Sequence, residues 1–351
     1  MRLGIIGLPG SGKTTVFNAL TGSAASTGDF PGAERGPNLG AVKVPEPRLA
    51  LLAKLHHPQK VTQVSVDYVD MGGLSGNAEK RQQLAEGFLS AIRPADALVH
   101  VVRNFPHPLH GPADPLGDFD RVETELIISD LIVVEKRLER IATDRKRGKK
   151  EDPQELRLLE QCRGTLEAGR PLRTEGAVAD APSLRGYTFL SAKPMLVLVN
   201  QAEGGSGSPS PLRSAETWPP SIEIVGKLEM ELAQLPPAEA AEFMTELGVE
   251  GLARDRVILA SHELLDLISF FTANEREVRA WNVRRGTPAV RAAGVVHSDM
   301  ERGFIRAEVV AYKGLEAAGS YAAAQKKGLV RLEGKEYIVQ DGDVIFFRFH
   351  V

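Results

Sequence analysis

The stretch LGIIGLPGSGKTT, residues 3–15, leads from a short apolar run through a glycine-rich turn into the tripeptide Gly12-Lys13-Thr14. Together with Gly7, this tripeptide fits the pattern G-x-x-x-x-G-K-[ST]. The pattern lies between a predicted strand and a predicted helix that begins near Thr14, which is the context that the motif requires. Glycines in such a turn let backbone N–H groups point at phosphate oxygens, and the helix N-terminus adds partial positive charge. The stretch therefore predicts a phosphate-binding loop in an α/β fold.

The side chains of this loop predict how a nucleotide would be held. Lys13 reaches the β- and γ-phosphates, and the hydroxyl of Thr14 is placed to bind Mg²⁺. A chance glycine turn that opens a helix is the alternative, and the flanking strand and helix count against it. The predicted nucleotide-binding residues of the loop are Gly7, Pro9, Gly10, Ser11, Gly12, Lys13, Thr14 and Thr15.

A second motif, DMGG at residues 70–73, closes the predicted strand 64–70. In this D-x-x-G pattern the Asp70 carboxylate would hold Mg²⁺ through water, and the Gly73 amide would meet the γ-phosphate. The pattern alone is weak, because an aspartate often caps a turn, but its place at the carboxyl end of a buried strand strengthens it. The predicted catalytic groups are Lys13 and Gly73, and the predicted metal ligands are Thr14 and Asp70.

A motif for the nucleotide base is predicted at the end of MLVLVNQAE, residues 195–203, where GTPases carry Asn-Lys-x-Asp. In GTPases the aspartate accepts hydrogen bonds from the guanine edge, and the asparagine ties loops together. Here Asn200 is retained, Gln201 replaces the lysine, and Glu203 stands where the aspartate would. Because the glutamate side chain is longer, we expect it to miss the guanine edge, so that ATP is accepted and GTP is less favoured. An ordinary polar end of a strand is the alternative.

The order of the predicted strands and helices specifies the type of α/β fold. Apolar runs alternate with helical patterns over the first two hundred residues, which is typical of a mostly parallel, doubly wound sheet with helices on both faces. Ligands of such sheets bind at the carboxyl ends of the strands. The predicted strands are 3–7, 64–70, 97–102, 195–200 and 221–225, with 39–44 as a candidate antiparallel edge strand.

An inserted helical pattern separates the third and fourth of these strands. Apolar residues recur there at alternating spacings of four and three, which is typical of a coiled coil. A second helix has a start signal at Asp152-Pro153. We predict that residues 121–170 form an antiparallel helical hairpin with a basic tip, DRKRGKK at 144–150. The tip is either a solvated turn or a contact to phosphate-rich RNA, and the sequence favours neither.

The C-terminal part of the chain predicts a separate α+β domain. After a helical stretch expected to run from 234 to about 271, a strand is predicted at 277–283 and a helix at 315–328. The segment 336–349 predicts two strands around an Asp-Gly turn. The predicted domains are a nucleotide-binding domain (1–120 and 171–276), the hairpin (121–170) and the C-terminal domain (277–351).

Composition narrows the class of protein. Among 351 residues, 42% are hydrophobic and 25% are charged, and the net charge of −3 argues against a globally basic nucleic-acid binder. Cys162 is the only cysteine, so no disulfide can form within the chain. The sequence has no signal-like start and no run of about 18 apolar residues, and we expect a cytoplasmic protein outside the membrane. His100 is predicted to be a core residue, and Trp281 part of a half-buried sheet.

With these motifs in this order, nearly the whole chain resembles the YchF-type family of Obg-related P-loop proteins, the Obg-like ATPases. The opening 3–22 is similar to that family's opening, and four further segments match in order, at 42–53, 88–105, 131–141 and 193–203. Residues 270–312 and 331–349 resemble the family's TGS domain, a ubiquitin-like β-grasp module. The resemblance implies a P-loop domain with a coiled-coil hairpin and a TGS domain. It also implies nucleotide-dependent ribosome binding, and ATP acceptance through the Asn200 and Glu203 variant.

The chain departs from that family in both switch regions. Glu34 replaces the family's threonine in the first switch, and a carboxylate there could bind Mg²⁺ or oppose the γ-phosphate. The second switch, residues 76–89, is helix-forming and charged rather than rich in glycine. The sequence leaves three hypotheses for the function. The favoured one is a slow ATPase or GTPase switch that binds the ribosome or RNA. The others are a nucleotide-sensing module that no longer hydrolyses and, with least support, a P-loop kinase.

Overall fold

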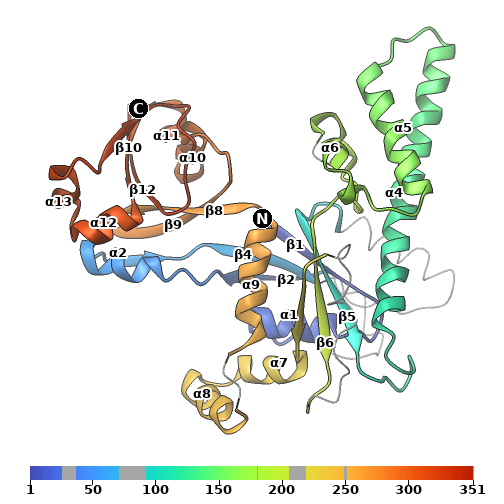
Figure 1. Cartoon of the computed structure of the whole chain (residues 1–351), viewed down its shortest axis with the longest axis horizontal. Coiled ribbons are helices and arrows are strands. Elements are labelled where there is room, and N and C mark those ends of the chain that lie inside the picture. The colour runs from blue at the N-terminus through green and yellow to red at the C-terminus, as the bar shows by residue number, and fades with distance from the viewer. Residues whose placement is uncertain (26–36, 71–91, 180, 205–218, 249–250, 351) are drawn as a thin grey trace. The chain divides into compact units, whose positions relative to one another are not determined.

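The computed structural model describes residues 1–25, 37–70, 92–179, 181–204, 219–248 and 251–350, and Figure 1 labels their helices and strands. Contacts divide the chain into two compact units. The first is Met1–Val42 with Asp67–Val257, and the second is Lys43–Val66 with Ile258–Val351. Among the described helices, none combines the length and the apolar character that a membrane span needs.

The first unit is built on a six-stranded sheet in the order β2-β4-β1-β5-β6-β7. Four of its strand pairs, β1–β4, β1–β5, β5–β6 and β6–β7, are parallel. The five strands predicted for this sheet are found at their predicted positions, and 39–44 becomes the edge strand β2, whose antiparallel direction stays a prediction. The strands are β1 (Arg2–Ile6), β2 (Asn38–Lys43), β4 (Ser65–Asp70), β5 (Ala97–Asn104), β6 (Met195–Gln201) and β7 (Ser221–Ile224).

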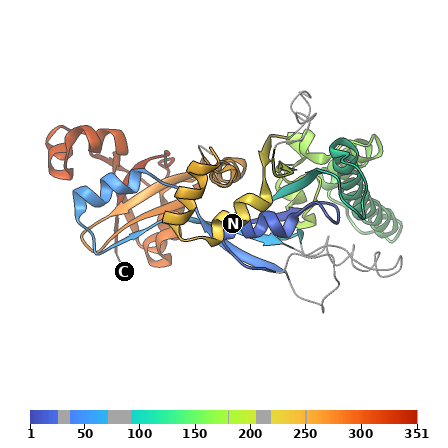
Figure 2. The same cartoon turned by 90° about the horizontal axis from the view of Figure 1, so that it is seen from below.

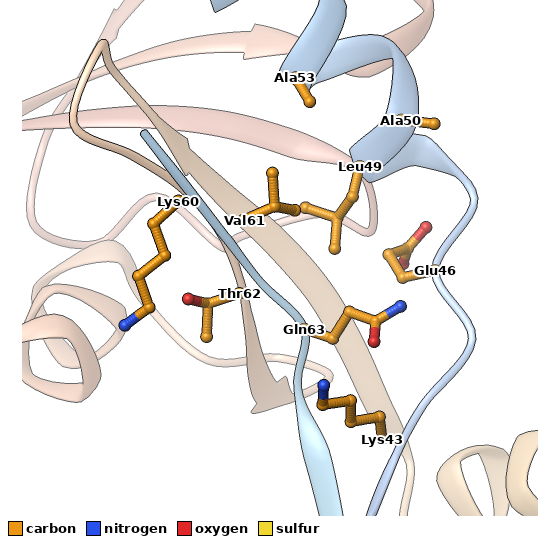
Figure 3. A pocket seen from close by; sticks show the side chains of 9 residues that line it. All are labelled: Lys43, Glu46, Leu49, Ala50, Ala53, Lys60, Val61, Thr62 and Gln63. Carbon is orange, nitrogen blue, oxygen red and sulfur yellow. The ribbon is translucent and has the colours of Figure 1, made fainter. Parts of the chain in front are cut away.

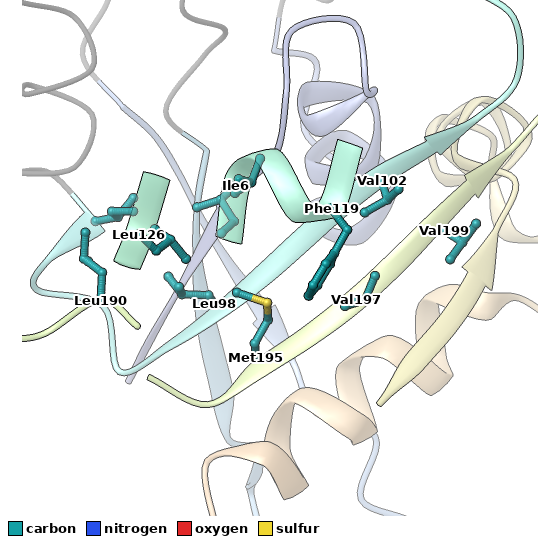
Figure 4. Close-up of a cluster of buried hydrophobic side chains, with 11 residues drawn as sticks. Ile6, Leu98, Val102, Phe119, Leu126, Leu190, Met195, Val197 and Val199 are labelled. Atoms are coloured by element: carbon teal, nitrogen blue, oxygen red, sulfur yellow. The ribbon is translucent and has the colours of Figure 1, made fainter. Parts of the chain in front are cut away.

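Helices bury the faces of this sheet. All residues of β5 are buried, as expected of a central strand with helices on both sides. Phe119 and Leu126, from the first turns of α4, join Leu98 and Met195 of the sheet in one apolar cluster (Figure 4). This cluster anchors the base of α4 to β5 and β6. Helix α1 (Lys13–Thr21) follows β1, and three helices follow β7. They are α7 (Gly226–Gln234), α8 (Pro237–Glu246) and α9 (Ala253–Leu264).

A long helical hairpin extends from the first unit. It consists of α4 (Pro115–Lys146) and α5 (Pro153–Glu167), which lie side by side in both views (Figure 1, Figure 2). Asp114 and Asp152 cap the two helices by accepting hydrogen bonds from backbone N–H groups, and each is followed by proline. Helix α4 begins at Pro115, earlier than the predicted start at 121. Three short helices follow, η1 (Leu172–Thr174), α6 (Gly176–Ala179) and η2 (Pro182–Tyr187).

The second unit has its own six-stranded sheet, in the order β11-β10-β12-β8-β9-β3. Strands β8 and β9 form an antiparallel pair, and β3 adds to β9 in parallel with Lys60 opposite Glu277. The strands are β3 (Lys60–Thr62), β8 (Leu267–Ala273), β9 (Glu277–Arg284), β10 (Phe304–Ala311), β11 (Arg331–Glu333) and β12 (Asp343–Phe349). Its helices are α2 (Arg48–His56), α10 (Ala289–Val296), α11 (Ser298–Arg302), α12 (Tyr312–Ala318) and α13 (Tyr321–Lys326).

An open hollow of about 540 Å³ lies in the second unit between α2 and β3 (Figure 3). Leu49 of α2 and Val61 of β3 point toward each other across it, and Lys43 and Lys60 lie at its margin. None of the predicted nucleotide-binding residues lines it.

The predicted helical stretch up to residue 271 is wrong in its last part. Helix α9 ends at Leu264, and Asp266 then adopts a positive φ of 51°. The residues that follow, LISFFTA, are mainly β-branched or aromatic, and they form the buried strand β8. Strand β8 pairs with β9 in the second sheet, upstream of the predicted domain start at 277.

Two further predictions in the C-terminal segment are corrected. The helix predicted at 315–328 is two helices, because Gly319 ends α12 with a φ of 76° and Ser320 caps α13. Of the two strands predicted at 336–349, only β12 forms. The Asp343 carboxylate accepts a hydrogen bond from the backbone N–H of Gln340 at 2.9 Å, which folds the preceding residues into a turn.

The three-domain division stays a prediction. The contacts add one fact to it, since residues Lys43–Val66 group with the C-terminal part of the chain. Two contacts join this segment to the C-terminal part. Strand β3 pairs with β9, and the guanidinium of Arg48 forms an ion pair with Asp341 at 2.7 Å.

Candidate nucleotide-binding site

The loop between β1 and α1 has a backbone that only glycines fit. Gly7, Gly10 and Gly12 have φ angles of 148°, 72° and 89°. A Cβ atom on Gly7 would lie 2.4 Å from the carbonyl oxygen of Val101 in β5. A Cβ atom on Gly12 would lie 2.2 Å from Nδ2 of Asn200 in β6. The loop is therefore held tightly against the carboxyl ends of the two neighbouring strands.

Lys13 and Ser11 give this loop its polar character. The Lys13 ammonium donates hydrogen bonds to the carbonyl oxygens of Gly7 at 3.0 Å and Leu8 at 2.8 Å, so it lies over the start of the loop. The Lys13 side chain is only 5% exposed. Ser11 Oγ is buried and has no hydrogen-bond partner among the described residues. A buried cation and an unsatisfied hydroxyl in one glycine loop fit an anionic ligand with acceptor oxygens.

The two predicted metal ligands meet at the edge of this loop. Thr14 Oγ1 donates a hydrogen bond to Asp70 Oδ2 at 2.8 Å, and Asp70 is fully buried at the end of β4. The parallel register places Asp70 opposite Ile5 of β1, which explains why the carboxylate reaches the start of α1. Asn38 Nδ2 donates to the same oxygen at 3.3 Å. Hydroxyl and carboxylate oxygens are ligands that Mg²⁺ prefers, so this donor set fits that ion.

Asn200 connects three elements around the loop. Its Nδ2 donates to the carbonyl oxygen of Ser11 at 3.0 Å, and its Oδ1 accepts from the N–H of Gly226 at 3.0 Å. Since Gly226 opens α7, one side chain ties β6, the phosphate loop and α7 together. This is the loop-tying contact expected of the asparagine in the base motif.

The other two residues of the base motif have different surroundings. Gln201 Oε1 accepts a hydrogen bond from Asn104 Nδ2 at 2.9 Å, at the end of β5. Glu203 Oε2 pairs with the ammonium of Lys227 at 2.9 Å, and this pair is largely exposed. The nearby Glu203 carboxylate raises the pKa of Lys227. Base recognition by these two side chains stays a prediction.

Several predicted groups lie outside the described residues. They are Gly73, Glu34, residues 28–36 of the first switch, and the second switch at 76–89. Pro9 lies in the glycine loop and Thr15 in the first turn of α1. His100 is a core residue as predicted, since it is buried and stacks on Phe119 with ring centroids 5.2 Å apart. Burial, helped by the charges of Arg173 and Lys13, lowers the pKa of His100 to about 3.

No motif in the sequence pointed to the loop that joins β5 to α4. Its His107 and His110 rings lie with their centroids 4.7 Å apart, and both approach Gly10 of the phosphate loop. One signal was present, because both histidines follow a buried parallel strand, and the carboxyl ends of such strands carry ligand sites.

Comparison with known families agrees with this geometry. Residues 2–137 match the family described as "50S ribosome-binding GTPase". Residues 267–350 match the family YchF-GTPase_C, described as "Protein of unknown function (DUF933)". The second match begins where β8 begins, in accord with the position of that strand in the C-terminal sheet.

Relatives that match along the whole chain narrow the assignment. A Bacillus subtilis protein named "Ribosome-binding ATPase YchF" is 40% identical, with 100% of both chains covered. A Haemophilus influenzae protein of the same name is 39% identical, covering 100% of this chain and 99% of its own. The solved structure of a Schizosaccharomyces pombe "YchF GTPase" matches 99% of this chain and 97% of its own, with a TM-score of 0.84 and 28% identity. The chain therefore belongs to the YchF family.

Proposed function

We propose that this protein is a slow, Mg²⁺-dependent ATPase that binds the ribosome in the cytoplasm, with GTP as the less favoured nucleotide. The observation that carries the proposal is the phosphate loop, in which Lys13 and the Thr14–Asp70 pair converge beside the N-terminus of α1. The names of the relatives from Bacillus subtilis and Haemophilus influenzae support both the ATPase activity and the ribosome as partner.

In this proposal the loop backbone and Lys13 bind the phosphates, and Asn200 keeps the loop in register with β6. Thr14 and Asp70 would hold Mg²⁺, which when bound would offset phosphate charge and orient the γ-phosphate. The Gly73 amide remains the proposed contact to that phosphate.

The proposal includes the three-domain organisation. It treats α4 and α5 as a coiled-coil insertion. A row of buried apolar side chains between the two helices supports this, formed by Ile127, Val134, Ile141, Leu159 and Cys162. It takes the C-terminal sheet as the TGS-like β-grasp domain, with β8 added at its start.

Ligand-linked stability tests the nucleotide part of this proposal. A ligand that binds only the folded state stabilises it, by about 2.7 kcal/mol when present at 100 times its Kd. We therefore expect the thermal midpoint of the protein to rise with Mg-ATP, and to rise less when EDTA removes the metal. An unchanged midpoint at millimolar ATP would count against a nucleotide site.

The hairpin tip supplies the proposed contact to ribosomal RNA. Two of its cations are paired, Lys149 with Asp144 at 2.9 Å and Arg145 with Glu151 at 3.9 Å. The exposed tip cations that form no ion pair among the described residues are Lys146, Arg147 and Lys150. Unpaired cations on a projecting turn fit a phosphate-rich surface, because binding releases counterions from the nucleic acid.

Replacing Lys146, Arg147 and Lys150 by alanine tests this contact. We expect weaker ribosome binding and a salt dependence reduced by about one unit of slope for each lost phosphate contact. Co-sedimentation with ribosomes over a range of salt concentrations measures both. The control, Arg157→Ala with Arg163→Ala, removes exposed charge from the side of α5. An equal loss of ribosome binding in the tip variant and in the control would show that the tip has no special role.

A further inference from the structure

One buried arginine holds the loop that follows β5. Arg103, near the end of that strand, is only 4% exposed. Its guanidinium donates hydrogen bonds of 2.8, 2.9, 3.0 and 3.3 Å to four backbone carbonyl oxygens of this loop, those of Phe105, Gly111, Pro112 and His110. We call residues 105–112 the Arg103 loop. A single side chain thus binds both ends of the loop.

The chemistry of this contact requires arginine. Four carbonyls spread over one loop need a planar fork with several fixed N–H donors, whereas a lysine ammonium offers a compact point charge. Asp118 in the first turn of α4 lies 3.7 Å from the guanidinium and supplies the balancing negative charge. Burial raises the pKa of Asp118, and the charge of Arg103 opposes that rise.

The Arg103 loop is also closed on itself. His107 and Gly111 exchange two backbone hydrogen bonds, of 2.9 and 2.8 Å, and Gly111 adopts a φ of 71°. This tight turn brings the side chains of His107 and His110 to the same side, where their rings lie together.

That side of the loop meets the phosphate loop. A Cβ atom added to Gly10 would lie 2.5 Å from Cδ2 of His110 and 3.4 Å from Nε2 of His107. The two imidazole rings therefore pack against the backbone that is proposed to bind phosphate. A chain of contacts runs from Arg103 through four carbonyls to the rings, and from the rings to Gly10.

We propose that Arg103 is a positioning residue for nucleotide hydrolysis. It fixes the Arg103 loop against Gly10, and so holds the phosphate loop in one geometry on that side of the nucleotide. This inference rests on the proposed ATPase function. Small displacements matter in such a site, since a shift of about 1 Å can lower a rate by about a hundredfold.

Arg173, whose side chain is 14% exposed, offers a comparison for Arg103. Arg173 forms a two-pronged ion pair with Glu123, with distances of 2.7 and 2.9 Å, and the pair does not include the phosphate loop. Arg173→Lys is therefore the matched control for Arg103→Lys. Arg121→Ala is the second control, because exposed Arg121 lies 3.4 Å from Asp118 but holds no carbonyl of the loop.

The test combines hydrogen exchange with single-turnover hydrolysis in the full-length protein. In Arg103→Lys we expect faster exchange at the backbone amides of this loop that carry a hydrogen, those of Phe105, His107, Leu109, His110 and Gly111. We also expect ATP hydrolysis slowed by about tenfold to a hundredfold, with the Kd for ATP within about threefold of the original. Arg173→Lys and Arg121→Ala should leave exchange in this loop and the hydrolysis rate unchanged. The exchange result does not depend on hydrolysis, so an inactive parent protein would overturn the ATPase proposal separately.

Gly111→Ala keeps the test decisive if Arg103→Lys fails to fold. Nothing lies within 4 Å of a Cβ atom at Gly111, so this change strains the turn through its positive φ without disturbing the core. We expect it to loosen the same loop and to slow hydrolysis in the same direction. Faster exchange in residues 105–112 together with an unchanged hydrolysis rate, in either variant, would overturn the proposal.

Discussion

Lys13→Ala is expected to weaken ATP binding by about thirtyfold or more and to remove ATP hydrolysis, since truncating one partner of a buried charge contact costs about 2–5 kcal/mol. The Lys13 ammonium lies over the carbonyls of Gly7 and Leu8, buried in the loop that is proposed to hold phosphates. Titration of the purified variant with ATP, followed by a phosphate-release assay, measures both losses.

The fold should tolerate this change. Lys13 is the first residue of α1, alanine is a good helix former, and the ammonium donates hydrogen bonds to the backbone carbonyls of Gly7 and Leu8. Circular dichroism should therefore give the parent spectrum. Lys54→Ala, on the exposed face of α2, removes the same charge far from the loop in sequence and should bind ATP normally. If Lys13→Ala retained full affinity, the nucleotide would have to bind elsewhere.

The base motif gives the second large expected effect. ATP should bind the native protein at least as tightly as GTP, because Gln201 and Glu203 do not supply the lysine stem and short carboxylate that recognise guanine. Changing both, Gln201→Lys with Glu203→Asp, should move the preference toward GTP by about 1–3 kcal/mol, the usual effect of satisfying a buried polar group. Titrating both nucleotides against both proteins measures the shift.

A control separates base recognition from the loss of a local ion pair. Glu203 pairs with Lys227, so the double variant also alters that contact. Lys227→Ala removes the pair but leaves the motif, and it should not change the ratio of the two affinities. A native preference for GTP of tenfold or more would show that Asn200 to Glu203 do not read the base as argued.

The sequence was informative where structure is local or periodic. The glycines around Lys13 are required by the backbone that they adopt, so the motif itself predicts the loop. Asp70 and Asn200 could be placed beside it because carboxyl ends of neighbouring parallel strands share one edge of a sheet.

Contacts between distant segments could not be predicted in this way. Strand β3 pairs with β9 although Lys60 and Glu277 are far apart in the chain, and three residues carry too little pattern to reveal a strand. The hydrogen bonds of Arg103 to the loop that follows β5 could not be predicted for a related reason. Its partners are backbone carbonyls, which every residue possesses, and only the folded loop brings them around one guanidinium.

Single-turnover hydrolysis by the purified, full-length protein, with Mg-ATP and Mg-GTP side by side, tests the central claim most directly. The account predicts slow release of phosphate from ATP, slower release from GTP, and none from either nucleotide with Lys13→Ala. Binding of ATP without any release would contradict it and would favour a nucleotide-sensing module. Release that requires a small-molecule acceptor would contradict it in favour of a kinase.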